Sequence, residues 1–193
     1  MRIIYLFVLV TSLHFLSSFL ILNQDDDGKI LWSKNVRLTE KDFRMEPPIK
    51  DSTIFARSRI EITAQSQQIE NGIPIFTLKT YFVKDSSFMF IKDNNTLEHE
   101  QVHFDIAELY TRKMRRDMEQ LQLKGILEID TYLEIIRKRK KENNQLDSLF
   151  DTQCRGEIIY GKIIKNAHQV RQKEWIDSIT IELDKLKDYE YME

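Results

Sequence analysis

Residues 97–116 read LEHEQVHFDIAELYTRKMRR, and the segment HEQVH at residues 99–103 matches the pattern H-E-x-x-H. On a helix, side chains four residues apart lie one above the other, so His99 and His103 can bind the same metal ion. Glu100 lies about 100° round the helix from His99. From there its carboxylate can take a proton from a water on the metal. This arrangement is typical of zinc-dependent peptide hydrolysis.

The surrounding residues predict that this segment is helical. Residues 94–96 (NNT) offer side-chain oxygens for an N-cap, and apolar residues then recur mostly at three- and four-residue steps. No proline or glycine interrupts the segment before Gly125. At 3.6 residues per turn, His99 and His103 share one side of the helix with Tyr110. We therefore expect both histidines to point inward.

A resemblance to a known family rests on HEQVHFDIAE at residues 99–108 and on LTEKDF at residues 38–43. The first resembles the core H-E-Q-x-H-F-D-I-A-E of a family of bacterial predicted secreted zinc-dependent proteases, and the second resembles that family's L-T-x-x-D-F. The order of a strand pair, the motif helix and a long helical tail is also similar. The resemblance implies a zincin-like metalloprotease domain over residues 24–193, one Zn²⁺ ion, and a peptide or protein substrate.

The first residues predict export. Met1 and Arg2 form a short positive end, and residues 3–22 are uncharged and mostly apolar. About twenty such residues can just span a bilayer as a helix. Residues 1–23 are therefore interpreted as a signal peptide, which we favour, or as an N-terminal membrane anchor. Both place the rest of the chain outside the cytoplasm, as a periplasmic, extracellular or membrane-anchored protein.

Composition limits the remaining possibilities. About 170 residues after the leader suffice for one domain. The net charge of −2 argues against general nucleic-acid binding. Cys154 is the only cysteine, so the chain has no internal disulfide. Its most common fate is an unpaired buried thiol. The alternatives are a catalytic thiol or a metal ligand.

The fold class follows from how strand and helix signals are distributed. Alternating or β-favouring residues predict strands at 30–33, 36–38, 54–68, 73–83 and 86–91. Asn71-Gly72 is a strong turn signal, which makes the two longest strands a hairpin. After Gly125, helices are predicted at 126–148 and 164–186. We expect an α+β fold in which a small antiparallel sheet packs on the HExxH helix and the C-terminal half is helical.

The motif supplies two metal ligands, whereas a hydrolytic zinc site needs three. His168 is the first choice, because it is the only other histidine beyond the leader. The resemblance points to it as well, since a histidine commonly precedes Gln-x-x-Trp in the family, as His168 precedes residues 172–175. Glu108 is the alternative, although an unbroken helix carries it away from the metal. An ion pair between Glu108 and Arg112 is the more common role for this spacing.

Other side chains complete the hypothesis. Glu100 is the predicted general base, and Tyr110 or Tyr160 could donate to the developing oxyanion. Asp105 could hold the ring of a ligand histidine. The sequence thus predicts an exported zinc metallopeptidase. Two alternatives remain open: a non-catalytic metal-binding or cell-envelope interaction domain, and a structural helical protein with a chance motif.

Overall fold

The computed structural model describes residues 28–47, 55–154, 157–159, 162–164 and 166–192. Its three α-helices are α1 (Asn94–Leu123), α2 (Ile129–Cys154) and α3 (Asn166–Lys185). Its strands are β1 (Lys29–Leu31), β2 (Ala56–Arg57), β3 (Ile60–Glu70), β4 (Ile73–Val83), β5 (Phe88–Met89), β6 (Glu157–Ile159) and β7 (Lys162–Ile164). Three short 3-10 turns lie at Glu40–Asp42, Lys84–Ser86 and Lys187–Tyr189.

The main sheet is antiparallel, with strand order β1-β4-β3. Asn71 and Gly72 connect β3 to β4 with positive φ angles of 51° and 84°, the backbone that a tight hairpin turn requires. The predicted hairpin is therefore confirmed. The predicted strand at 86–91 is shorter, because only β5 forms there, and it pairs with β2 outside the main sheet.

The predicted strand at residues 36–38 is wrong. This segment has no strand partner in the described part of the chain. The backbone N–H of Leu38 donates instead to Oε1 of Gln101, 2.9 Å away on α1. A side chain of the motif helix thus satisfies a backbone group that a neighbouring strand would otherwise bind.

The motif helix α1 begins and ends at clear signals. Asp93, one residue before the predicted cap, has extended φ and ψ, and its Oδ1 accepts from the N–H of Thr96 at 2.8 Å. At the other end Gly125 has a φ of 69°. The N–H groups of Gly125 and Ile126 bond to the carbonyls of Gln122 and Leu121, which is a Schellman motif.

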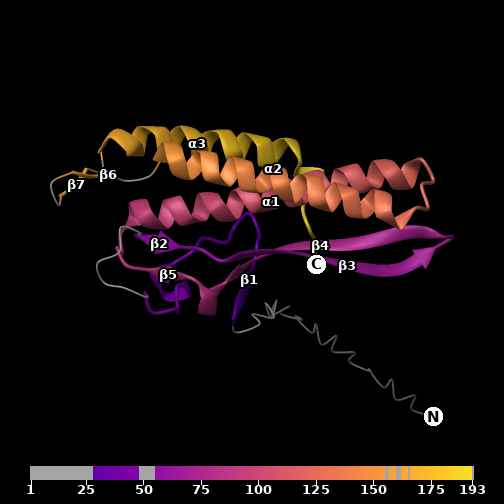
Figure 1. Ribbon diagram of the computed structural model, residues 1–193, viewed down its shortest axis with the longest axis horizontal. Helices are drawn as coiled ribbons and strands as arrows, with labels where there is room; N and C mark the ends of the chain where they lie inside the picture. Colours follow the sequence, from indigo (N-terminus) through magenta and orange to yellow (C-terminus); the bar gives the residue numbers. More distant parts are fainter. Residues whose placement is uncertain (1–27, 48–54, 155–156, 160–161, 165, 193) are drawn as a thin grey trace, which may run out of the picture.

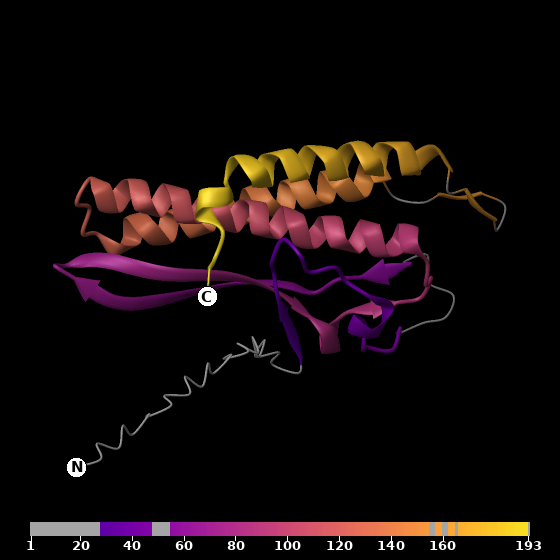
Figure 2. The same ribbon diagram turned by 180° about the vertical axis from the view of Figure 1, so that it is seen from behind.

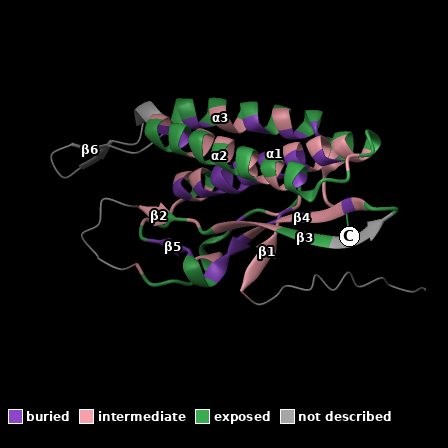
Figure 3. Ribbon diagram, turned by 45° about the vertical axis from the view of Figure 1, so that its right-hand side comes forward, coloured by how far each residue is buried: buried purple, intermediate pink, exposed green. Residues whose placement is uncertain are grey.

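The helices form a layer on one side of the sheet (Figures 1 and 2). α1 contacts β4 on one side and both α2 and α3 on the other. Burial follows this arrangement, since α1 is mostly buried whereas α2 and α3 expose a polar outer face (Figure 3). The C-terminal segment returns from α3 toward the sheet, where Tyr191 lies 4.4 Å from Nζ of Lys79.

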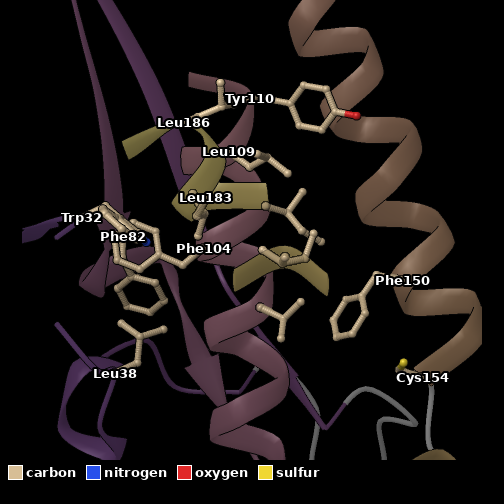
Figure 4. Close-up of a cluster of buried hydrophobic side chains, with 13 residues drawn as sticks. Trp32, Leu38, Phe82, Phe104, Leu109, Tyr110, Phe150, Cys154, Leu183 and Leu186 are labelled. Carbon is tan, nitrogen blue, oxygen red and sulfur yellow. The ribbon is translucent and has the colours of Figure 1, made fainter. Parts of the chain in front are cut away.

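Two apolar clusters hold these layers together. The larger joins β1, β4 and all three helices, and its members include Trp32, Phe82, Phe104, Phe150 and Leu183 (Figure 4). The smaller lies nearer the hairpin tip and comprises Leu78, Met114, Met118 and Tyr132. Both clusters take residues from α1, which is buried on the side of the sheet and on the side of the other two helices.

A mixed α+β chain with small antiparallel sheets and a helical C-terminal half is therefore confirmed. The helix predicted at 126–148 extends six residues further, to Cys154, and the helix predicted at 164–186 spans 166–185. Within the described ranges, no helix is long and apolar enough to cross a lipid bilayer. The predicted leader at 1–23 lies outside the described residues.

Candidate metal centre

The two motif histidines lie on the face of α1 that meets α2. Their Nε2 atoms are 3.2 Å apart, and their ring centroids are 4.9 Å apart. Both side chains are mostly enclosed, with 16% of His99 and 11% of His103 exposed. The structure therefore places the two imidazoles as the helical spacing predicts, one turn apart and directed toward a common point.

A third donor comes from α2. Oδ1 of Asp151 lies 3.2 Å from Nε2 of His99 and 3.2 Å from Nε2 of His103. With the contact between the two rings, the three atoms form a nearly equilateral triangle. They are the one group of three potential metal ligands found among the described residues.

The residues present fit a zinc ion. Metal–ligand distances of about 2.0–2.2 Å at tetrahedral angles separate neighbouring ligand atoms by about 3.3–3.6 Å. The three measured separations are 3.2 Å, slightly inside that range. Two imidazole nitrogens and one carboxylate oxygen also form the kind of donor set that hydrolytic zinc sites use. The donor chemistry and the spacing agree.

Each histidine is held from behind through its other ring nitrogen. Nδ1 of His103 lies 2.5 Å from Oδ1 of Asp147, and Nδ1 of His99 lies 3.3 Å from Oε1 of Gln172. Nε2 of Gln172 donates to the carbonyl of Asn95, which turns the amide oxygen toward His99. Because these partners can accept, they favour a proton on both Nδ1 atoms, so both Nε2 lone pairs would be available to an ion bound at the triangle.

The electrostatics of this cluster favour a positive charge. Burial lowers the pKa of His103, but hydrogen bonds to Asp147 and Asp151, with the charges of Asp147 and Glu100, outweigh burial and raise it to about 10. Burial pushes the pKa of Asp151 up, yet its contacts with His103 and His99 hold that pKa well below its usual range. The carboxylates around His103 therefore favour a positive charge on its ring.

Phe150 fixes the two rings from the side of α2. Its ring stacks on His99 with centroids 4.5 Å apart and meets His103 edge-on at 5.0 Å. Trp175 of α3 packs against the far side of Phe150 at 5.6 Å. Phe150 is fully buried beside Cys154 on α2 (Figure 4). The histidines are thus held by packing as well as by hydrogen bonds.

Glu100 faces the same space. Only 4% of this residue is exposed, and its Oε2 accepts a hydrogen bond from Oγ of Ser58 at 2.5 Å. Glu100, His99, His103 and Asp151 all line one cavity of about 730 Å³. Residues 55–63 line the same cavity, as do side chains of α1 and α2. Its volume suits a ligand several residues long.

Glu108, the alternative third ligand, lies elsewhere. It is 2% exposed and accepts from Nε of Arg112 at 3.1 Å, from Nη1 of Arg115 at 2.9 Å and from the hydroxyl of Thr80 at 2.8 Å. Arg112 also donates to the carbonyl of Leu183, and Arg115 donates to the carbonyls of Leu78 and Tyr189. Glu108 therefore ties α1 to β4 and to the C-terminal segment, and the predicted pair with Arg112 is confirmed.

Two further candidates, Tyr110 and Asp105, also lie apart from the triangle. Tyr110 belongs to the core cluster, at the opposite end from Cys154 in Figure 4, with Nζ of Lys113 4.3 Å from its ring. It does not line the cavity. Asp105 accepts from the indole of Trp32 and from Gln101 rather than from a ligand histidine. Asp147 takes the role that was predicted for Asp105.

The structure does not describe the side chains of Tyr160 and His168. A third candidate, Cys154, lines the cavity. Tyr160 is outside the described residues, and only the backbone of His168 is described, near the start of α3. Cys154 is unpaired and buried, and it lines the cavity. Burial raises the pKa of its thiol to about 11, so the thiolate form is disfavoured.

The sequence reasoning missed Asp147, Asp151, Gln172 and Ser58. One signal was available, because Asp147 and Asp151 are four residues apart, the same spacing as the two histidines. The predicted helix ended at residue 148, however, which left Asp151 outside it. Nothing local to Ser58 marks it as a site residue, whereas Gln172 was noted only as the start of the Gln-x-x-Trp that follows His168.

Comparisons with family models, with curated proteins and with solved structures return no match for this chain. The resemblance of residues 99–108 to a protease family therefore stays a prediction. The assignment of function depends on the geometry of the cavity.

Proposed function

We propose that this chain is an exported zinc-dependent metallopeptidase. His99, His103 and Asp151 would hold the ion, with Asp151 taking the place first considered for His168. The observation that carries the proposal is the triangle of donor atoms 3.2 Å apart, with the buried Glu100 lining the same cavity. A helix carrying H-E-x-x-H and packed on a small sheet would form the frame of a zincin-like domain over residues 24–193.

The residues of the chain would divide the reaction among them. A zinc ion, when bound, lowers the pKa of a coordinated water and polarises a carbonyl group. Glu100 would accept the proton of the attacking water and return it to the leaving amine. Ser58 would orient the Glu100 carboxylate, and Asp147 and Gln172 would hold the two imidazoles in the productive tautomer.

Substrate and location follow from the same proposal. The cavity is open to an unfolded peptide or protein segment, and nothing in the composition favours a nucleic acid. Residues 1–23 would direct export or anchor the chain at the membrane. The domain would then act as a periplasmic, extracellular or membrane-anchored enzyme.

The test is to measure bound metal and casein hydrolysis for the purified protein and for two variants. Glu100→Gln should keep one zinc per chain and lose at least a hundredfold in activity, because only the proton acceptor is removed. Glu98→Gln is the matched control, since Glu98 is an exposed acid on the same turn. It should leave metal and activity unchanged. Protein without metal, or equal activity in both variants, would contradict the proposal.

A non-catalytic metal-binding domain is the second candidate. It is favoured by the bond from Ser58, which already occupies one oxygen of the Glu100 carboxylate. In that case the wild-type protein and Glu100→Gln would bind one metal ion each, and neither would hydrolyse any peptide.

A further inference from the structure

α2 carries a run of basic residues that the proposed reaction does not use. Residues 137–141 read RKRKK. Arg139 has a structural role, because it bonds to Asp117 of α1 at 2.7 Å and to Glu142 at 2.6 Å. Lys140 and Lys141 are exposed, and neither makes an ion pair or a hydrogen bond with the described part of the chain. These two charges are therefore available to a ligand.

Lys140 belongs to the face of α2 that forms a wall of the cavity. With Lys140 taken as 0°, Asp147 lies at about −20° and Asp151 at about +20° round a helix of 3.6 residues per turn. All three residues line the cavity. Lys140 is thus on the same stripe of α2 as the third metal donor, two to three turns away from it.

The charges on the cavity lining are not balanced. Its acidic side chains have partners: Asp147 and Asp151 contact the histidines, Glu61 contacts Lys29, and Glu100 contacts Ser58. Three lining residues carry a charge that has no partner in the described part of the chain, and all three are basic: Arg57, Arg59 and Lys140. A cavity with this balance attracts an anionic ligand.

The cavity continues onto the basic side of α2. A second, more open hollow is lined, among the described residues, by the cations Arg137, Lys140 and Lys141 and by the polar residues Asn144, Gln145 and Ser148. Lys140 and Asn144 line both the hollow and the cavity. A ligand that fills the cavity can therefore extend past Lys140 to Lys141 along one surface. A peptide is long enough to reach both.

We propose that Lys140 and Lys141 form a subsite for acidic side chains of the substrate. Lys140 lies seven residues before Asp147 and eleven before Asp151, which is about 10–16 Å along the helix axis at about 1.5 Å per residue. An extended peptide covers that length in about three to five residues. The preferred substrate thus carries Asp or Glu about three to five residues from the cleaved bond. This inference rests on the proposed function for its choice of a peptide as ligand.

The first test compares two fluorescein-labelled peptides, both acetylated and amidated so that their ends carry no charge. One alternates Glu with Ala over about twelve residues, enough to span both surfaces, and the other has Gln in place of every Glu. Anisotropy titrations use the Glu100→Gln protein with zinc, which removes turnover from the readout. The Glu peptide should bind at least about tenfold more tightly, because each exposed ion pair contributes about threefold. Equal affinities would overturn the inference.

The second test locates the effect on the protein. In the same background, Lys140→Gln and Lys141→Gln should each weaken binding of the Glu peptide about threefold, and the double variant about tenfold. Lys138→Gln is the matched control, since Lys138 is exposed, lies about 160° round α2 from Lys140 and lines neither surface. It should leave the affinity unchanged. An equal loss in Lys138→Gln would show general attraction to a basic helix and would overturn the subsite.

An anionic membrane is the other ligand that a basic helix surface can bind. Cosedimentation with vesicles of phosphatidylcholine and phosphatidylglycerol in equal parts should give the same result for the parent protein and for the double variant. A double variant that binds these vesicles less well, with unchanged affinity for the Glu peptide, would overturn the peptide subsite and assign the lysines to lipid.

Mapping of cleaved bonds separates this inference from the proposed function. The wild-type protein and a double variant with Glu100 intact digest a mixture of proteome-derived peptides, and mass spectrometry locates the cleaved bonds. Wild-type cleavages should be enriched in Asp or Glu at the stated distance, and the double variant should lose this enrichment. Cleavage without enrichment refutes the subsite only. Charge-dependent binding without any cleavage refutes the proposed peptidase instead.

Discussion

Nδ1 of His103 and Oδ1 of Asp147 lie 2.5 Å apart, and this contact joins α1 to α2 behind the donor triangle. Asp147 does not belong to the triangle, but its carboxylate favours a proton on Nδ1 of His103. The affinity of the proposed metal site would therefore depend on a residue that does not touch the ion.

Replacing Asp147 should weaken zinc binding by a limited amount. We expect Asp147→Asn to lower zinc affinity about 10- to 100-fold, the usual effect of losing a carboxylate behind a ligand histidine. Asp151→Ala should cost more, because it removes a donor. Asp130→Asn, an exposed position on the same helix, should change nothing. Competition with a chromogenic chelator measures all three, and the same affinity for Asp147→Asn and wild type would contradict this role.

Ser58 should affect turnover without affecting metal binding. Ser58→Ala removes the hydrogen bond that orients Glu100, so kcat for a peptide should fall about tenfold while KM and zinc content stay unchanged. Ser58→Thr keeps the hydroxyl and should restore most of kcat. A change confined to KM would show that Ser58 contacts the substrate rather than positioning the base.

Glu108 should govern stability. Its carboxylate faces Arg112 and Arg115 in a nearly solvent-free setting. Glu108→Gln removes the charge that the two guanidinium groups share and leaves Arg112 with Glu190 alone. The free energy of unfolding in urea should fall by about 3–5 kcal/mol. Glu134→Gln breaks an exposed pair with Arg137 and should cost less than about 1 kcal/mol. Comparable losses in the two variants would argue against the buried network.

Cys154 should be unreactive in the folded protein. Burial raises the pKa of its thiol from the ordinary 9.0 to about 11, so alkylation by iodoacetamide at pH 8 should be at least tenfold slower than in urea. The folded state holds the proton where the unfolded state has lost it, so stability should fall as the pH rises from about 9 to 11. Equal alkylation rates in buffer and in urea would contradict this.

Short-range sequence patterns were sufficient to predict α1 and the hairpin. His99, Glu100 and His103 lie within two turns of one helix, and their relative placement depends only on helical geometry. Asn71 and Gly72 likewise specify a turn through their own backbone preferences. The end of α2 was predicted six residues too early. Asp151 was therefore not recognised as a residue of that helix.

The remaining parts of the candidate site depend on packing between distant segments. Asp151 meets His99 across 52 positions of the chain, Gln172 across 73, and Ser58 reaches Glu100 across 42. No local periodicity records such contacts, because they follow from how α2, α3 and the start of β3 pack around α1. The motif predicted that a metal could bind here, whereas only the packing of α2 against α1 brings Asp151 to the two histidines.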